Sequence, residues 1–216
     1  MALDQATIEG EDFIGLMGVA TDKYAIVSPK FRNASALEVP VFQDLVYGTH
    51  LIGIFCCGNS SGILMPYFTT ENEVSRIRKK LEPLGVSVGI VEDHYTSIGN
   101  LVAVNDNCAI ASPLVKNLEL ISDVLDVEVV CMDVEGHLEV GSCIEATNRG
   151  FIAHPDCGEI LDNLKDMFGV AGRTGTVNYG VPYVSTGILA NSFGAIVGGK
   201  TTGIEMGRID EALGFL

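Results

Sequence analysis

Two short segments of this chain combine residue types and spacings that could do chemistry. Residues 194–201 read Gly-Ala-Ile-Val-Gly-Gly-Lys-Thr, which matches the pattern of a phosphate-binding loop letter for letter. His154, Asp156 and Cys157 place an imidazole, a carboxylate and a thiol close together, a composition that could serve nucleophilic catalysis or bind a metal ion. Either motif could be functional only if the surrounding helices and strands hold its residues in the required positions. The secondary structure predicted around each motif therefore indicates whether the match is functional or accidental.

A repeat that occurs five times surrounds both motifs. Each copy starts with a small residue, continues through two β-rich runs separated by a polar turn, and closes with Pro or Gly. Asn, Asp and Ser suit the turn because their short side chains bond nearby backbone and tolerate left-handed geometry. A period of about 45 residues is typical of propellers and other repeat arrays. The copies span residues 15–29, 53–66, 99–113, 141–155 and 185–199, and their turn residues, counted seven back from the closing residue, are Asp22, Asn59, Asp106, Asn148 and Ser192.

Between the hairpins the apolar period changes from two to about 3.6, which predicts a helix and then a further strand in each copy. Residues 70–81 show this best, with Glu71 and Glu73 in the first turn and basic residues in the last. The first helix is least clear because Pro40 lies inside its stretch. In an open row of five such α/β units, the first and the last unit would each expose an apolar face. Closing the row into a ring buries both of these faces. We expect one domain over residues 12–216, with approximate units 12–48, 49–94, 95–137, 138–180 and 181–216, and an N-terminal segment over residues 1–11.

This organisation argues against a nucleotide site. Residues 195–197 have the pattern of the second strand of the fifth copy, whereas a phosphate-binding loop must bend between a strand and a helix. Only 15 residues follow Thr201, too few for further strands that would supply a magnesium-binding carboxylate. We expect residues 198–199 to turn the chain into a helix capped by Thr201 or Thr202.

The histidine and cysteine pattern favours a structural role. His154 stands where other copies carry Ser28, Met65 or Ser112, a strand end with no shared chemistry. The four histidines show no paired metal spacing. The six cysteines form no CxxC pair, and most lie in β-rich runs, as expected of buried, reduced thiols. We therefore expect no metal and no other cofactor.

Composition narrows the class of protein. Hydrophobic residues make up 47% of the chain and charged residues 19%, which suffices for a sizeable core. No apolar run reaches the roughly 18 residues of a membrane span, and acidic residues occupy the N-terminus where a signal peptide would be basic and then apolar. The net charge of −15 is opposite to that of proteins that wrap bare nucleic acid. We expect a cytoplasmic protein that binds neither membranes nor free nucleic acid. The negative charge either serves only to keep the protein soluble or matches a partner protein with a basic surface.

Several segments together carry a family resemblance. They are residues 98–101 (Ile-Gly-Asn-Leu), 147–150 (Thr-Asn-Arg-Gly), 175–180 (Gly-Thr-Val-Asn-Tyr-Gly) and 198–203 (Gly-Gly-Lys-Thr-Thr-Gly). In these segments the chain resembles translation initiation factor 6, from about residue 12 to the end, and its length resembles the archaeal form. The resemblance implies a pentein fold, in which five pseudo-symmetric αβ units form a closed, propeller-like ring.

The resemblance also implies a function. Members of this family bind the large ribosomal subunit on its intersubunit face, chiefly through a ribosomal protein of the L14/L23 type near the sarcin–ricin loop. They thereby block joining of the small subunit, and in eukaryotes they also act in large-subunit maturation. A chain of this kind is expected to be a monomer and not an enzyme. The family's subunit-facing positions are best matched by Asn59 and Asn100, with Asn105 and Asp106 near them in the repeat. The residues alone leave a second interpretation open, that all four are turn formers.

Two other classes of protein remain as alternatives. Other penteins are guanidine-modifying enzymes that use a nucleophilic Cys in a late glycine-rich loop, together with a His and two acids. Here no Cys follows Cys157, which disfavours an enzyme. A purely structural repeat protein would leave Asn59 and Asn100 without a role.

Overall fold

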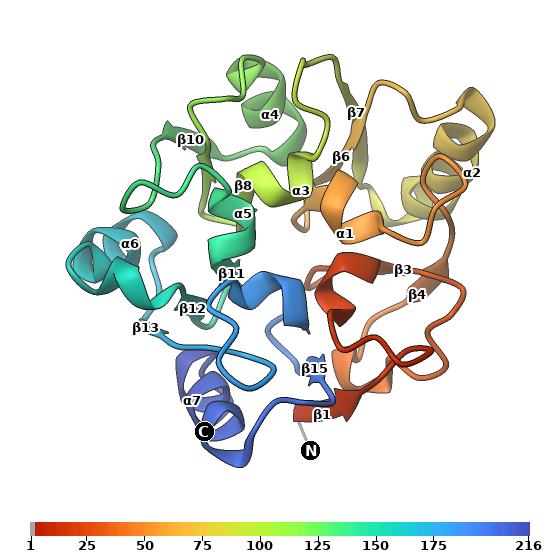
Figure 1. Ribbon diagram of the computed structural model, residues 1–216. Coiled ribbons are helices and arrows are strands. Elements are labelled where there is room, and N and C mark those ends of the chain that lie inside the picture. The colour runs from red at the N-terminus through yellow and green to blue at the C-terminus, as the bar shows by residue number, and fades with distance from the viewer. Residues whose placement is uncertain (1–2) are drawn as a thin grey trace.

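The computed structural model describes residues 3–216 as five three-stranded sheets arranged around a common centre (Figure 1). In each sheet an inner strand pairs antiparallel with a middle strand, which pairs in parallel with an outer strand. Within residues 3–216 the strand ladders stay inside each sheet, so other contacts close the ring. The predicted pentein arrangement of five α/β units is confirmed. From inner to outer, the strands of units 1 to 5 are β2 (Gly18–Ala20), β3 (Ala25–Val27) and β4 (Val41–Gln43); β5 (Cys57–Gly58), β6 (Gly62–Pro66) and β7 (Ser87–Val91); β8 (Val102–Val104), β9 (Cys108–Ala111) and β10 (Glu128–Cys131); β11 (Ile144–Ala146), β12 (Phe151–Ala153) and β13 (Gly172–Thr174); and β14 (Ile188–Ala190), β15 (Ala195–Gly198) and β1 (Leu3–Ala6).

A helix follows the middle strand in four units and lies on the outside of the ring (Figure 1). The helix predicted over residues 70–81 is α2, and Thr70 caps it, because the Thr70 hydroxyl accepts from the backbone of Glu73 and the Glu73 carboxylate accepts from the backbone of Thr70. Unit 1 has only the 3₁₀ turn η2 (Ser35–Leu37), since Pro40 lacks an N–H and disfavours helix at the preceding residue. The helices are α2 (Glu71–Leu81) with η3 (Glu82–Leu84), α4 (Leu118–Leu125), α6 (Leu161–Phe168) and α7 (Gly203–Ala212).

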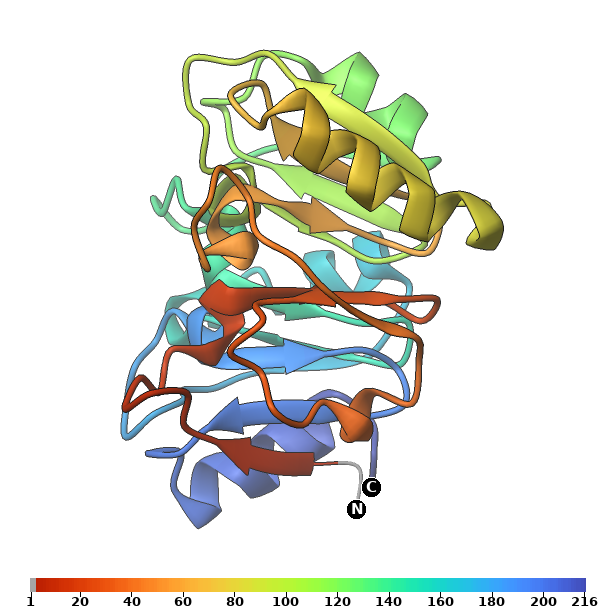
Figure 2. The ribbon, with the colours of Figure 1, turned by 90° about the vertical axis from the view of Figure 1, so that its right-hand side faces the viewer.

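The ring has two different faces. One-turn helices precede the five inner strands and form the one-turn-helix face: η1 (Ile14–Met17), α1 (Ile52–Phe55), α3 (Ile98–Leu101), α5 (Val140–Cys143) and η5 (Val184–Gly187). The five hairpin turns between inner and middle strands form the opposite, hairpin face. Figure 2 shows the ring from the side, with the one-turn helices of units 1 and 2 on the left and the hairpin turn of unit 1 on the right. A further 3₁₀ turn, η4 (Pro155–Gly158), follows the middle strand of unit 4.

The N-terminal segment belongs to the ring, contrary to the sequence-based boundary at residue 12. Strand β1 pairs in parallel with β15 and supplies the outer strand of the fifth sheet, so both ends of the chain complete one unit (Figure 1). The Lys200 ammonium lies 3.0 Å from the Asp12 carboxylate, and Asn178 Nδ2 donates to Asp12 O at 2.7 Å. Local pattern could not reveal this strand, because its partner lies at the other end of the sequence.

The hairpin of unit 2 is one residue out of the predicted register. Cys57 pairs with Leu64 in unit 2 and Ala103 pairs with Ile110 in unit 3, so Asn59 is equivalent to Asn105. Counting back seven positions from the closing residue equates Asn59 with Asp106. That count takes Pro66 as the closing residue, but the hairpin of unit 2 closes one residue later. Pro66, rather than Met65, is therefore the unit 2 equivalent of Ser112 and His154.

Asparagine side chains in the hairpin turns hold neighbouring units together. Asn59 Nδ2 donates to Leu125 O, the last residue of α4 in the next unit, at 2.8 Å. The last carbonyl groups of a helix have no hydrogen-bond donor within that helix, and here a side chain of the preceding unit donates to one of them. The same bond runs from Asn105 to Phe168 O at 2.9 Å and from Asn191 to Leu37 O at 2.8 Å. We call these three residues the hairpin asparagines.

Units 1 and 4 carry threonine at the position of the hairpin asparagines, and other side chains there reach the next unit. The Tyr24 hydroxyl donates to Gly62 O at 3.0 Å, and the Arg149 guanidinium donates to Gly214 O. Every joint of the ring therefore has a polar contact to the backbone of the following unit.

The apolar core is divided into clusters that span adjacent units. One cluster joins Cys57 and Leu64 of unit 2 with Val102 and Ile121 of unit 3. A single unit would expose this surface, which makes the ring the unit of stability. Within residues 3–216, no helix is long and apolar enough to cross a membrane.

Asn105→Ala should lower the free energy of unfolding by about 2–4 kcal/mol in urea denaturation, because Thr147 O loses its side-chain donor, Phe168 O keeps only that of Asn107, and two N–H groups of the turn lose their acceptor. The side chain of Asn105 donates to Thr147 O and Phe168 O and accepts from two backbone N–H groups of its own turn. Asn33→Ala is the matched control, because Asn33 is exposed and accepts one bond. Equal, small losses in both variants would show that the hairpin asparagines do not hold the ring.

Candidate functional site

The one-turn-helix face surrounds one mouth of a narrow central channel, and glycine allows the units to approach there. A Cβ on Gly53 would lie 2.0 Å from Gly15 O, and one on Gly99 would lie 2.0 Å from Gly53 O. Gly141 stands in the same relation to Gly99. No side chain fits at these contacts, which explains the small residue that starts each repeat.

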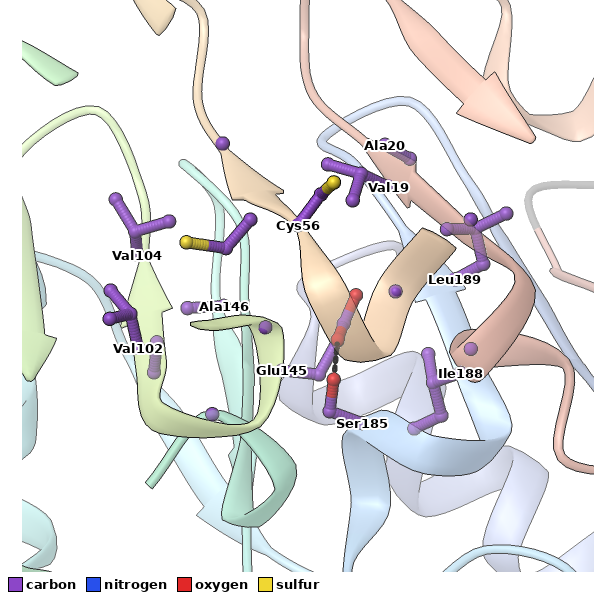
Figure 3. A pocket seen from close by; sticks show the side chains of 18 of the residues that line it. Val19, Ala20, Cys56, Val102, Val104, Glu145, Ala146, Ser185, Ile188 and Leu189 are labelled. Carbon is purple, nitrogen blue, oxygen red and sulfur yellow. Dashed lines mark hydrogen bonds between the residues drawn. The ribbon is translucent and has the colours of Figure 1, made fainter. Parts of the chain in front are cut away.

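Unit 5 breaks this pattern with Ser185. Its hydroxyl donates to Glu145 Oε2 at 2.7 Å inside the channel, and Glu145 Oε1 accepts from Ala190 N at 3.2 Å (Figure 3). Apolar side chains such as Val102 and Leu189 line the same channel. Burial raises the pKa of Glu145 to about 8, despite these two hydrogen bonds. Glu145 is partly exposed and lines the channel.

The channel does not carry the machinery of a thiol enzyme. Cys56 and Cys57 line it, and burial raises the pKa of both thiols, that of Cys57 to about 12. Burial also raises the pKa of Cys143 and Cys157 to about 12. A catalytic cysteine needs a thiolate, and these four thiols stay protonated at neutral pH.

Three of the four predicted contact residues lie on the hairpin face and serve the ring itself. Asn59 and Asn105 are each only 3% exposed, and their amides bond the adjacent unit. Asp106 is exposed, but its carboxylate accepts from Ser60 N and from Asn148 Nδ2, at 2.8 and 2.7 Å. The bonds that these three side chains make lie within the hairpin turns and between neighbouring units, so their role in the turns is only part of their role in the ring.

Asn100 lies on the other face, in the one-turn helix α3. It precedes the inner strand β8 whereas Asn105 follows it, so the structure does not bring Asn100 together with the other three candidates. Its side chain is partly exposed and makes no hydrogen bond within residues 3–216. Of the four candidates, only Asn100 has an amide with both donor and acceptor available to a partner.

The loops of the one-turn-helix face also carry exposed apolar side chains. Tyr47 and Tyr179, 60% and 83% exposed, stand in tight turns with positive φ, each followed by a glycine. Phe13, Leu16 and Tyr183, among others, line a shallow hollow. An apolar surface of this kind is typical of a protein-binding site. Exposed apolar residues of this face include Phe13, Tyr47, Leu51, Tyr67, Tyr95, Leu138, Tyr179 and Tyr183.

The sequence-based reasoning missed this apolar surface. Tyrosine and leucine in connecting loops look like the ends of apolar runs. The Tyr-Gly pairs at residues 47–48 and 179–180 were the available signal, because a tight turn with left-handed geometry, of two residues in the first case and three in the second, exposes the tyrosine.

The segment that matches a phosphate-binding loop is a buried strand end. Residues 195–198 form β15, the middle strand of unit 5, as predicted. Thr202 caps α7 with Glu205 in a capping box, so Thr202 rather than Thr201 is the cap. Lys200 pairs with Asp12 instead of reaching toward a phosphate position.

We expect no saturable heat when ATP or GTP with magnesium is titrated into the protein at millimolar concentration. The backbone N–H groups that would cradle phosphate belong to the ladder of β15. Saturable micromolar binding that Lys200→Ala removes would contradict this expectation.

Glu145→Gln should flatten the dependence of stability on pH. The native pKa of about 8 exceeds the ordinary value of 4.5, so the native state binds this proton more tightly than the unfolded state. The stabilisation is therefore complete below about pH 4.5 and is lost as the pH rises through 8, by up to about 1.4 kcal/mol per unit of pKa difference.

The measurement for Glu145 is urea denaturation at intervals between about pH 5 and about pH 9. Glutamine keeps the polar contacts without ionising, so the wild type should lose more stability over this range than Glu145→Gln. Glu119→Gln, at an exposed position of α4, is the control and should behave as wild type. Parallel curves for all three proteins would contradict the account.

Comparison with known proteins agrees with this architecture. A family model described as the eIF-6 family matches residues 3–212. The translation initiation factor 6 of Pyrococcus horikoshii is 37% identical and is covered over its whole length by the whole of this chain. The factor of Methanosarcina mazei is 35% identical over 94% of both chains, and the eukaryotic translation initiation factor 6 of Schizosaccharomyces pombe is 35% identical over 95% of this chain and 88% of its own. The chain belongs to the eIF-6 family.

Proposed function

We propose that this translation factor binds the large ribosomal subunit on its intersubunit face and prevents the small subunit from joining. The names of its relatives, translation initiation factor 6, support a role in translation initiation. The mechanism is steric: a rigid ring on the joining surface excludes the other subunit without turnover. A further role in large-subunit biogenesis belongs to the same proposal.

The observation that carries the proposal is the difference between the two faces. On the one-turn-helix face, the side chain of Asn100 makes no hydrogen bond within residues 3–216, and the loops of the same face carry exposed aromatic side chains. On the hairpin face, Asn59 and Asn105 are committed to the ring. We therefore assign subunit binding to the one-turn-helix face.

Charge supports a protein rather than bare RNA as the main contact. The net charge of −15 repels phosphate, whereas ribosomal proteins are basic. A ribosomal protein of the L14/L23 type near the sarcin–ricin loop is the proposed partner, bound by a cytoplasmic monomer. Aromatic side chains on the one-turn-helix face would anchor the contact, since Tyr is enriched among residues that dominate binding energy.

The competing function, a guanidine-modifying enzyme, has less support. It requires an activated thiol, and burial raises the pKa of the channel cysteines instead. We infer that the protein is not an enzyme.

Asn100→Asp should weaken co-sedimentation with large subunits and weaken the block on subunit joining. The carboxylate loses the amide donors and adds an unpaired charge, which costs about 1–3 kcal/mol, or roughly 5-fold to 150-fold in affinity. Lys200→Ala should leave binding almost unchanged, because Lys200 pairs with Asp12 within the ring.

Two matched variants test the assignment of the face. Tyr179→Ser removes an exposed aromatic ring from the one-turn-helix face, and Phe193→Ser removes one from the hairpin face. Only the first should reduce binding. The reverse result, with both variants folded, would show that the face is wrong, and wild type that does not bind subunits at low salt would overturn the proposed function itself.

A further inference from the structure

Unit 4 brings together three polar side chains to which the proposed function assigns no role, and Tyr183 packs beside two of them. His137 Nε2 lies 3.0 Å from Asp156 Oδ2, and His154 Nδ1 lies 3.6 Å from the same oxygen. The two imidazole rings are 4.3 Å apart between centroids. One donor atom from each side chain lies within 4.8 Å of those of the other two. We call these three residues the His–His–Asp cluster.

Two rigid turns position the cluster. His137 follows a tight turn in which Gly136 has a φ of +83°, and Gly136 N donates to Asp133 Oδ1 at 2.8 Å. His154 directly follows the middle strand β12, and Pro155 starts η4 after it. The sequence places His154 and Asp156 together, but the search for paired histidine spacing missed His137, which comes from a separate loop that only the fold brings to them.

We propose that the His–His–Asp cluster is a binding site for a divalent transition-metal ion such as Zn²⁺. Two imidazoles and one carboxylate form a donor set that suits zinc and related ions better than Mg²⁺ or Ca²⁺, which prefer oxygen. Bonds of 2.0–2.1 Å in a tetrahedral site place ligand atoms about 3.4 Å apart, and the separations of 3.0 and 3.6 Å at Asp156 bracket this value. The fourth position is left to water.

The cluster lies at the boundary between the interior of unit 4 and solvent. The side chains of His154 and His137 are 7% and 23% exposed. The Asp156 side chain is 61% exposed, which lets an ion enter from solvent.

Metal binding must displace one internal hydrogen bond. His154 Nδ1 accepts from Asp156 N at 3.1 Å, as the cap of η4. A neutral ring that keeps this bond carries its proton on Nε2 and has no free lone pair. A metal ion that binds at Nδ1 therefore breaks the hydrogen bond from Asp156 N. A preformed, high-affinity structural zinc site has no such bond to break.

The test uses the full chain after chelator treatment, titrated with Zn²⁺ by calorimetry and with Co²⁺ by visible absorption. Wild type should bind one ion per chain saturably, and Zn²⁺ should raise its thermal unfolding temperature. His137→Asn and Asp156→Asn should each weaken binding by about tenfold or more and remove the thermal shift. Both residues have solvent-exposed side-chain surface, so both variants are expected to fold.

Two control variants remove exposed metal-binding groups elsewhere, His94→Asn and Cys131→Ser. Both should bind Zn²⁺ as wild type does. The proposal is overturned if wild type shows no saturable binding, if the cluster variants bind as wild type does, or if Cys131→Ser alone abolishes binding. Because the measurement needs no ribosome, its outcome is independent of the proposed function in translation.

Discussion

Each outer helix of this ring ends with carbonyl groups that its own unit leaves unpaired, and in three joints the asparagine of the preceding hairpin donates to one of them. The bond requires the hairpin turn of one unit to lie against the helix end of the next. Asn59 makes this bond between units 2 and 3, and at the opposite face the contact of Gly99 with the Gly53 carbonyl fixes how closely the same two units approach. The two contacts together set the wedge shape of a unit, and a wedge of this shape closes when five units meet. Stability, burial and the identity of the two faces all depend on this joint.

A closed ring needs the same joint five times, although the chain that forms it has two ends. Strand β1 resolves this conflict by entering the fifth sheet, and Asp12 then meets both Lys200 and Asn178 where the chain passes into unit 1. Lys200, which looks catalytic in sequence, is thus part of the closure. The joint between units 4 and 5 departs most from symmetry, because Ser185 replaces glycine and places a polar contact with Glu145 inside the channel.

Local patterns allowed most of the fold to be predicted from the sequence. The hairpin repeat and the helix of residues 71–81 follow from side-chain periodicity and capping, which act over a few residues. Strand β1 could not be predicted, because its pairing with β15 is a contact between the two ends of the chain. The error of one residue in unit 2 came from Pro66, which occupies the last position of β6 and resembles the closing proline of other copies. The sequence could have shown that Asn100 and Asn105 lie on opposite faces of the ring, because the strand predicted between them places one residue at each of its ends.

The candidate site is best understood from what each polar group already does inside the molecule. Asn59 and Asn105 would each have to break bonds to the next unit before they could bind a partner, and their burial would hinder the approach. Asn100 breaks none, so its whole hydrogen-bonding capacity adds to an interface. The same reasoning separates the His–His–Asp cluster from the buried cysteines: the thiols are enclosed and protonated, whereas Asp156 faces solvent with two imidazoles beside it. In a symmetric ring most polar positions are occupied by the joints, and the groups that the joints leave unused are therefore the ones to examine for function.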